Sequence, residues 1–249
     1  MSPKENLIQK ISNTLLDLIF PEEGLCFICD KFHEEVREDH ICSDCREELF
    51  FIKENRCPKC GKPAYGDKIS SKCSYCSGKE FYFTRAISSL EYRGVLRDTI
   101  HKYKFEDKAY MYKAFGELML RTVLNENIMP IDIIVPVPLH RRRKAERGYN
   151  QSELLAKYLS QNLDIPLDKQ NIKRIKRTNI QNKLDRLERQ KNLKDAFKVE
   201  DKGVFKNKRV LLVDDIFTTG ATVNECSRVI KECGSNEIIV ITIATGRNV

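Results

Sequence analysis

Two adjacent carboxylates stand between an apolar run and a turn of small polar residues near the end of the sequence. The apolar run covers 210–213, the acids are Asp214 and Asp215, and the turn covers 218–222. Backbone N–H groups of such a turn favour an anion, whereas carboxylates accept hydrogen bonds from sugar hydroxyls or hold a hard cation through water. The stretch therefore predicts a site for a sugar that has a phosphate at one end and free hydroxyls at the other.

A strand and a helix must position these groups. The run VLLV at 210–213 has no polar break, as expected of a strand buried on both faces of a parallel sheet. After the turn, apolar or small residues recur at helical spacing: Val223, Cys226, Val229 and Ile230. An ordinary strand, turn and helix, in which the acids only cap the helix, is the alternative interpretation.

This stretch resembles the phosphoribosyl-pyrophosphate (PRPP) loop of type I phosphoribosyltransferases, in which D-D and T-T-G-x-T follow a hydrophobic strand. The resemblance implies that Asp214 and Asp215 face the ribose 2′- and 3′-hydroxyls, and that Mg²⁺ binds together with PRPP. It also implies that the turn surrounds the 5′-phosphate, with these residues: Thr218, Thr219, Gly220, Ala221 and Thr222. Phe217 departs from the pattern, because a smaller aliphatic residue is more usual there.

A second apolar run, IDIIVPVP at 131–138, leads into a basic loop and a further predicted helix. The resemblance implies a pyrophosphate loop here, whose backbone N–H groups come from three residues: Val137, Leu139 and His140. The two prolines of the run have no N–H group to offer. Arg147 is the expected side-chain ligand, because an arginine fork suits phosphate oxygens.

Two other groups of basic residues have a surface interpretation. The block RRRK at 141–144 is either part of the phosphate site or a solvated run of charge. Lys102 and Lys104 lie on an earlier predicted helix, and we interpret them as surface lysines.

Residues 170–197 are rich in Lys and Arg and lie between two predicted core strands. The patterns R-T-x-x-Q and R-x-x-N resemble the flexible loop of the amidophosphoribosyltransferase branch. The resemblance implies that Arg177 and Arg189 belong to a cationic lid that closes over pyrophosphate. The same charges could instead follow a nucleic-acid backbone. No aromatic residue lies among them, so this segment gives little support to base stacking.

Eight of the ten cysteines form four C-x-x-C pairs between residues 26 and 76. Two such turns complete a closed Cys₄ zinc site, and the spacing favours two successive zinc ribbons with one Zn²⁺ each. The ligands of the first ion are then Cys26, Cys29, Cys42 and Cys45, and those of the second are Cys57, Cys60, Cys73 and Cys76. A cross-braced arrangement, first pair with third and second with fourth, is the alternative.

Composition divides the chain into an amphipathic helix at 1–20, a double zinc ribbon at 21–80 and a third segment at 81–249. We expect the third segment to have the α/β fold of type I phosphoribosyltransferases, a parallel sheet flanked by helices. No stretch approaches the roughly 20 apolar residues of a membrane span, and the N-terminal segment lacks the compact apolar core of a signal peptide. We therefore expect a cytoplasmic protein, in which paired thiols bind metal.

The order of these motifs over nearly the whole chain resembles the ComF family of competence proteins, in which a double zinc ribbon is fused to a phosphoribosyltransferase domain. The resemblance implies a role in DNA uptake, with PRPP or a related ribose phosphate as ligand and with single-stranded DNA and competence-machinery proteins as partners. The formal net charge of +8 is consistent with phosphate-rich partners. The alternative is a metabolic phosphoribosyltransferase that acts on an unidentified nitrogen acceptor and has no DNA role. No catalytic acid or base stands out, so transferase activity is left open.

Overall fold

The computed structural model describes residues 24–37, 39–53, 55–64, 73–176 and 193–246. The chain separates into two compact units, Met1–Glu48 and Leu49–Val249. The predicted helix at 1–20 lies outside the described residues. The predicted segment limits at residues 20 and 80 stay predictions. Within the described residues, no helix is both long and apolar enough to cross a bilayer.

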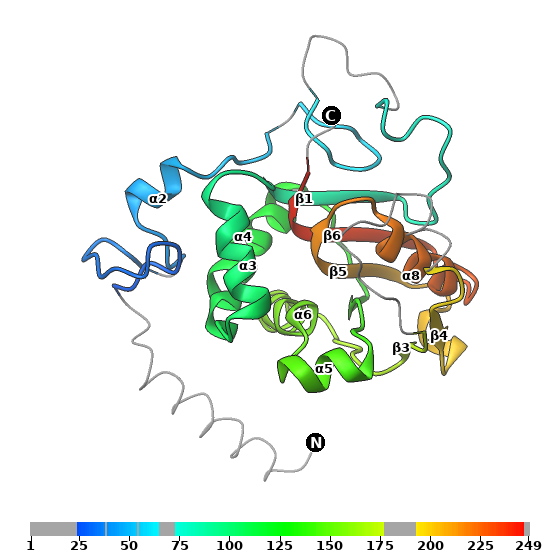
Figure 1. Ribbon diagram of the computed structural model, residues 1–249. Coiled ribbons are helices and arrows are strands. Elements are labelled where there is room, and N and C mark those ends of the chain that lie inside the picture. Colours follow the sequence, from blue (N-terminus) through cyan, green and yellow to red (C-terminus); the bar gives the residue numbers. More distant parts are fainter. Residues whose placement is uncertain (1–23, 38, 54, 65–72, 177–192, 247–249) are drawn as a thin grey trace. The chain divides into compact units, whose positions relative to one another are not determined.

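The larger unit is built on a four-stranded parallel sheet (Figure 1). In spatial order its strands are β1 (Arg85–Glu91), β6 (Glu237–Thr245), β5 (Arg209–Phe217) and β2 (Ile133–Pro136). Val213 of β5 pairs with Ile241 of β6 on one side and with Pro136 of β2 on the other. Because all these pairings are parallel, the carboxyl ends of the strands meet at one edge of the sheet.

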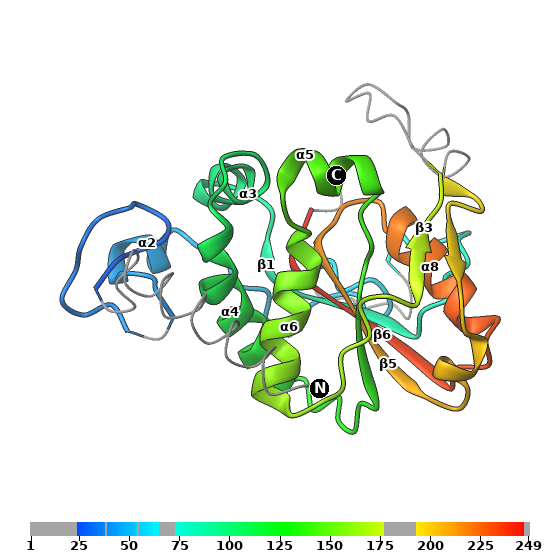
Figure 2. The ribbon, with the colours of Figure 1, turned by 90° about the horizontal axis from the view of Figure 1, so that it is seen from below.

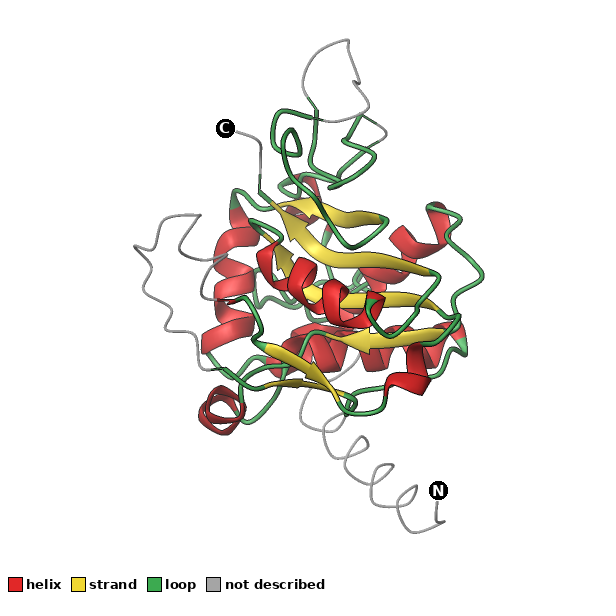
Figure 3. Ribbon diagram, turned by 90° about the vertical axis from the view of Figure 1, so that its right-hand side faces the viewer, coloured by secondary structure: helices red, strands yellow, loops and turns green. Residues whose placement is uncertain are grey.

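Helices cover both faces of this sheet (Figures 2 and 3). One face carries α8 (Ala221–Lys231), and the other carries α4 (Tyr112–Asn125) and α6 (Gln151–Leu163). The remaining elements are α2 (Ser43–Glu47) of the smaller unit and α3 (Val95–Phe105), η1 (Ala109–Met111), α5 (Arg141–Arg147), β3 (Ile172–Arg174), β4 (Phe197–Val199) and η2 (Lys202–Phe205) of the larger. The expected parallel sheet flanked by helices is therefore confirmed.

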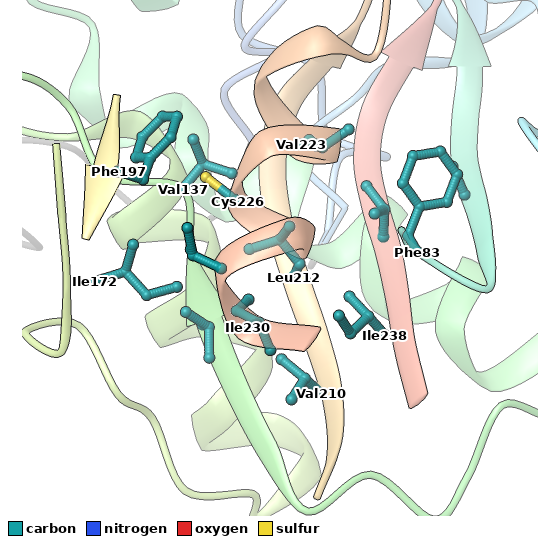
Figure 4. Packing of buried hydrophobic residues seen from close by; sticks show 14 of the residues in the cluster. Phe83, Val137, Ile172, Phe197, Val210, Leu212, Val223, Cys226, Ile230 and Ile238 are labelled. Atoms are coloured by element: carbon teal, nitrogen blue, oxygen red, sulfur yellow. The ribbon is translucent and has the colours of Figure 1, made fainter. Parts of the chain in front are cut away.

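Both faces of β5 are covered by helices, which explains why the apolar run at 210–213 has no polar break. Val210 and Leu212 pack against α8, where Cys226 and Ile230 meet them (Figure 4). Leu211 and Val213, which alternate with them along the strand, are also fully buried, because the second face of the sheet is covered as well. The predicted strand and the helix that follows it are both present.

The cysteines gather into two groups in the order that the simpler sequence interpretation predicts. Within each group the Sγ atoms lie within 4.8 Å of one another, and the groups are Cys26, Cys29, Cys42, Cys45 and Cys57, Cys60, Cys73, Cys76. In the second group, Sγ of Cys60 lies 3.6 Å from Sγ of Cys73, and Sγ of Cys57 lies 3.9 Å from Sγ of Cys76. Sulfurs that share one tetrahedral Zn²⁺ are about 3.8 Å apart, so the residues fit the ion and the cross-braced alternative is wrong.

Local hydrogen bonds also suit a thiolate in the second group. Burial acts to raise the pKa of Cys57, but backbone N–H groups of Cys60, Cys73 and Lys59 outweigh it and lower the pKa to about 7. A deprotonated thiol is the form that ligates zinc. Burial instead raises the pKa of Cys60 and Cys76 in the same group, so Cys57 is the thiol that these contacts favour as a thiolate.

The second zinc ribbon is part of the core of the larger unit. Cys57 and Cys60 belong to the same apolar cluster as strand residues of the sheet. Gly61 has φ +68°, and a Cβ at this position would lie 2.4 Å from the carbonyl oxygen of Ala86 in β1, so only glycine allows this approach. The ammonium of Lys62, only 3% exposed, donates to the carbonyl of Gly246, 2.7 Å away at the end of β6.

This packing predicts that the second ion stabilises the sheet domain. We expect Cys73→Ser to lower the zinc content and to reduce the thermal midpoint of the larger unit by roughly 5 °C or more, equivalent to about 2 kcal/mol. Cys233→Ser is the matched control, because that buried thiol of the larger unit belongs to neither metal group and only donates to the carbonyl of Val229. Equal losses in both variants, with zinc retained, would contradict the role of the ion.

Candidate functional site

The two acids lie within a strand rather than after it. β5 continues to Phe217, because Asp214 still pairs with Thr242, and Phe217 with Thr245, of the neighbouring β6. Aspartate is unfavourable in strands, yet here the tertiary ladder overrides that preference. The strand thus holds both carboxylates on a rigid support at the carboxyl edge of the sheet.

Asp215 forms an ion pair with a lysine from α3. The Nζ atom of Lys104 lies 2.8 Å from Oδ2 of Asp215, and both side chains are mostly buried. The surface interpretation of Lys104 is therefore wrong. Its signal in the sequence was only its charge, since α3 and β5 meet through the fold and not through local spacing.

Asp214 is partly buried and accepts two hydrogen bonds at the same oxygen. The hydroxyl of Ser152 and the N–H of Asp215 each donate to Oδ1 at 2.9 Å. Burial, followed by the charge of Asp215, raises the pKa of Asp214 to about 7, although Lys104 and the two hydrogen bonds act to lower it. The second charge of the pair, on Asp214, is therefore the one that burial and its neighbour disfavour.

Ser152 is positioned by the first residues of α6. Asn150 caps this helix, since its side-chain oxygen accepts from the N–H of Ser152 at 3.2 Å. The amide nitrogen of Asn150 donates to the carbonyl of Val137 at 3.1 Å, which ties the helix to the loop after β2. The sequence interpretation assigned no site role to Asn150 or Ser152.

The turn after β5 is shaped by Gly220. This residue has φ 64°, and a Cβ there would lie 2.5 Å from the ring of Phe217. Phe217 is larger than the aliphatic residue usual at its position, and its ring fits because residue 220 is a glycine. Among the described residues, the N–H groups of Thr219 and Gly220 donate to no other group. They lie at the start of α8, where a helix favours an anion.

The loop after β2 supplies fewer N–H groups than the sequence suggested. The N–H of Val137 donates to the carbonyl of Val213 at 2.9 Å, so it belongs to the sheet and its expected role is corrected. In the described part of the chain, the N–H groups of Leu139 and His140 have no such partner. The His140 ring accepts from the N–H of Arg142 at 3.4 Å and caps α5.

Arg147 ends α5 and is already engaged within the protein. Its Nη1 atom lies 3.1 Å from Oε1 of Gln151, and its guanidinium lies 4.6 Å from the ring centre of Phe105. Gln151 directly precedes the Ser152 that contacts Asp214. Arg147 thus lies beside the acid pair's supporting helix.

Arg177 and Arg189 of the predicted lid lie outside the described residues. The segments that flank the lid pair with each other as antiparallel β3 and β4. Asp195, just before β4, is held by α8, because Arg228 contacts its carboxylate at 3.1 Å and Glu225 accepts its N–H at 2.8 Å. The flanks of the lid are therefore anchored to the same helix that begins at Gly220.

The fold and these sites define a phosphoribosyltransferase-like protein with a double zinc ribbon. Residues 15–77 match the family described as "Double zinc ribbon domain", and residues 150–248 match "Phosphoribosyl transferase domain". The chain is 32% identical over 233 residues to "Competence protein F" of Haemophilus influenzae, covering 92% of this chain and 93% of the relative.

Two further relatives agree with this classification. "DNA utilization protein YhgH" of Escherichia coli K12 is 32% identical over 221 residues, covering 87% of this chain and 95% of the relative. "Competence protein ComFC" of Bacillus subtilis is 28% identical over 229 residues, covering 84% and 90%. The chain belongs to the competence protein F (ComF) family, as its motifs indicated.

The raised pKa of Asp214 generates a prediction about stability. An unfolded aspartate titrates at about 3.9, so the folded state increasingly disfavours the ionised form as the pH rises from about 4 to 7. We expect Asp214→Asn to raise the free energy of unfolding by about 1 to 2 kcal/mol at pH 8, because the amide oxygen keeps both hydrogen bonds and the charge is lost.

Urea unfolding at pH 8 and at pH 4 tests this expectation. The gain should shrink towards zero at the lower pH, where the carboxyl group is neutral in the folded protein. Asp164→Asn, at an exposed left-handed position that ends α6, is the matched control and should show no such pH dependence. Destabilisation by Asp214→Asn at pH 8 would contradict the assignment.

Proposed function

We propose that this chain binds PRPP, or a related ribose phosphate, at the carboxyl end of β5. The observation that carries the proposal is the acid pair, Asp214 and Asp215, which is held beside Lys104 and followed by a turn with available N–H groups. The carboxylates suit the hydroxyl end of a ribose 5-phosphate, and the turn a few residues later suits its phosphate end.

The acid pair accepts hydrogen bonds from the ribose 2′- and 3′-hydroxyls. Lys104 holds the Asp215 side chain in place through an ion pair at 2.8 Å. Mg²⁺ fits the same place, since hard cations take carboxylate and water oxygens, and it would supply positive charge to the pyrophosphate group.

The 5′-phosphate lies against the turn that precedes α8. The N–H groups of Thr219 and Gly220 donate to it, and the hydroxyls of Thr218, Thr219 and Thr222 can do the same. Ala221 begins the helix behind this turn. The lack of a Cβ at Gly220 keeps the backbone accessible.

The pyrophosphate group meets positive charge and N–H donors from other segments. Leu139 and His140 offer backbone N–H groups, and Lys104 lies beside Asp215. Arg147 stands at the rim, and Arg177 and Arg189 of the lid neutralise further charge. If the chain is a transferase, the bond from C1 to the pyrophosphate oxygen breaks while a nitrogen nucleophile attacks C1, and these groups stabilise the departing charge.

We further propose that the protein acts in DNA uptake on incoming single-stranded DNA in the cytoplasm. The relatives' names refer to competence and to DNA utilization. The net charge of +8 and the helix α5, with five basic residues among seven, support contact with a polyanion.

Calorimetric titration with PRPP and Mg²⁺ tests the binding site. We expect the double variant Asp214→Asn, Asp215→Asn to lose at least about 100-fold in affinity, because each carboxylate accepts charge-assisted hydrogen bonds. Asp164→Asn should bind as the wild type does. Pyrophosphate release, assayed with and without DNA or ammonia, separates transfer from binding. Tight binding by the double variant would refute the assignment of this site.

A further inference from the structure

An exposed aromatic ring lies among basic side chains at the end of α3. Phe105 is 60% exposed, so much of its ring is open to solvent. The guanidinium of Arg147 lies 4.6 Å from the centre of its ring, and the ring of His101, one helical turn earlier, lies 4.9 Å away. Phe105 thus combines a solvent-facing π surface with neighbouring donors of positive charge.

Hydrogen bonds hold the last turn of α3, which carries this ring, in place. The hydroxyl of Tyr149 donates to the carbonyl of Tyr103 at 2.8 Å, and the side-chain nitrogen of Gln151 donates to the carbonyl of Lys104 at 3.5 Å. These carbonyls belong to the last turn of α3, which has no partners within its own helix. The end of α3 is therefore tied to the segment between α5 and α6 and to the start of α6; Figure 2 shows these three helices as neighbours.

The adjoining helix α5 has a composition that its own packing does not explain. Five of its seven residues are basic, and none of the seven is buried. Arg141 and Lys144 are three residues apart, and Arg143 and Arg147 are four apart, so like charges repel along the helix. The ion pairs of Arg142 with Glu146 and of Lys144 with Glu153 are surface pairs, which contribute little. A polyanion on this helix would relieve the repulsion.

Two acidic residues, Glu106 and Asp107, follow Phe105 in the sequence. Glu106 follows Phe105 directly, but its carboxylate lies 3.5 Å from the His101 ring. Lys104, which precedes Phe105, reaches Asp215 at 2.8 Å. Phe105 thus follows a lysine of the candidate ribose-phosphate site, and its ring lies beside Arg147 of α5.

We propose that Phe105, with His101 and Arg147 beside it, and the helix α5 form a binding surface for single-stranded nucleic acid. An unpaired base stacks on Phe105, and the phosphates that flank it lie along α5. Stacking on an aromatic ring accepts any base, because every base has a π face, and arginine beside the ring adds to it. A duplex hides its base faces and cannot stack in this way. This inference rests on the proposed DNA role; it shares Arg147 with the proposed pyrophosphate site, whereas Phe105 belongs to this surface alone.

The surface supplies what the basic stretch from Lys173 to Lys194 lacks. That stretch offers charge with no aromatic residue between its lysines and arginines. The fold instead brings the ring of Phe105 in α3 next to the guanidinium of Arg147 in α5, 42 positions later in the sequence. This surface therefore combines positive charge for the nucleic-acid backbone with an aromatic ring for the base.

Fluorescence anisotropy with a labelled oligodeoxythymidylate and the full chain tests the proposal. Phe105→Leu keeps an apolar side chain and helix propensity but removes the π face, so we expect the affinity to fall about tenfold. The thermal midpoint and the affinity for PRPP should stay as in the wild type. Phe50→Leu is the matched control, because Phe50 is 37% exposed and lies under another guanidinium, that of Arg93, 3.1 Å away.

Salt dependence separates the two parts of the surface. The triple variant Arg141→Gln, Arg142→Gln, Lys144→Gln should reduce the slope of log affinity against log salt by about 2, whereas Phe105→Leu should leave the slope unchanged. The proposal is overturned if Phe105→Leu binds as tightly as the wild type or loses no more than Phe50→Leu does. Equal competition by a duplex of the same length would also overturn it. Absence of oligonucleotide binding in a chain that still binds PRPP would sink this proposal and leave the ribose-phosphate site standing.

Discussion

Two negative charges on neighbouring residues of one strand, partly removed from water, are the constraint on which the site depends. Burial and mutual repulsion oppose ionisation of both Asp214 and Asp215, which is why the pKa of Asp214 rises to about 7. Lys104 and Ser152 offset part of this cost from two different helices. A packed strand end carries such a pair only if ligand binding or another function requires it, since two apolar residues would be less costly here.

The surroundings of the acid pair keep it rigid from several sides. Phe217 lies under Gly220, and its carbonyl accepts from the hydroxyl of Thr245 at 2.9 Å and from the N–H of Gly246 at 3.4 Å. The carbonyl of Gly246 accepts from Lys62 of the second zinc ribbon. The second zinc ribbon thus supports the edge of the sheet at which the candidate ligand site lies, through successive hydrogen bonds that join Lys62, Gly246 and Phe217.

The sequence predicted the features that depend on neighbours along the chain. Strand β5, the turn at Gly220 and the sequential zinc groups follow from local spacing and apolar runs, and the structure contains them. The sequence did not predict the contact of Lys104 with Asp215 or that of Arg147 with Phe105, because both depend on how distant helices meet. The prediction that the N–H of Val137 binds a ligand was wrong for the same reason. Only the pairing of β2 with β5 shows that the carbonyl of Val213 already accepts this N–H.

The most direct test of the central claim is a crystal structure of the protein with ribose 5-phosphate. The account predicts that the 2′- and 3′-hydroxyls lie within hydrogen-bond distance of the carboxylates of Asp214 and Asp215. It also predicts that the phosphate accepts from the N–H groups of Thr219 and Gly220. A ligand bound elsewhere, with the Lys104 to Asp215 pair intact and the turn closed by its own side chains, would contradict it.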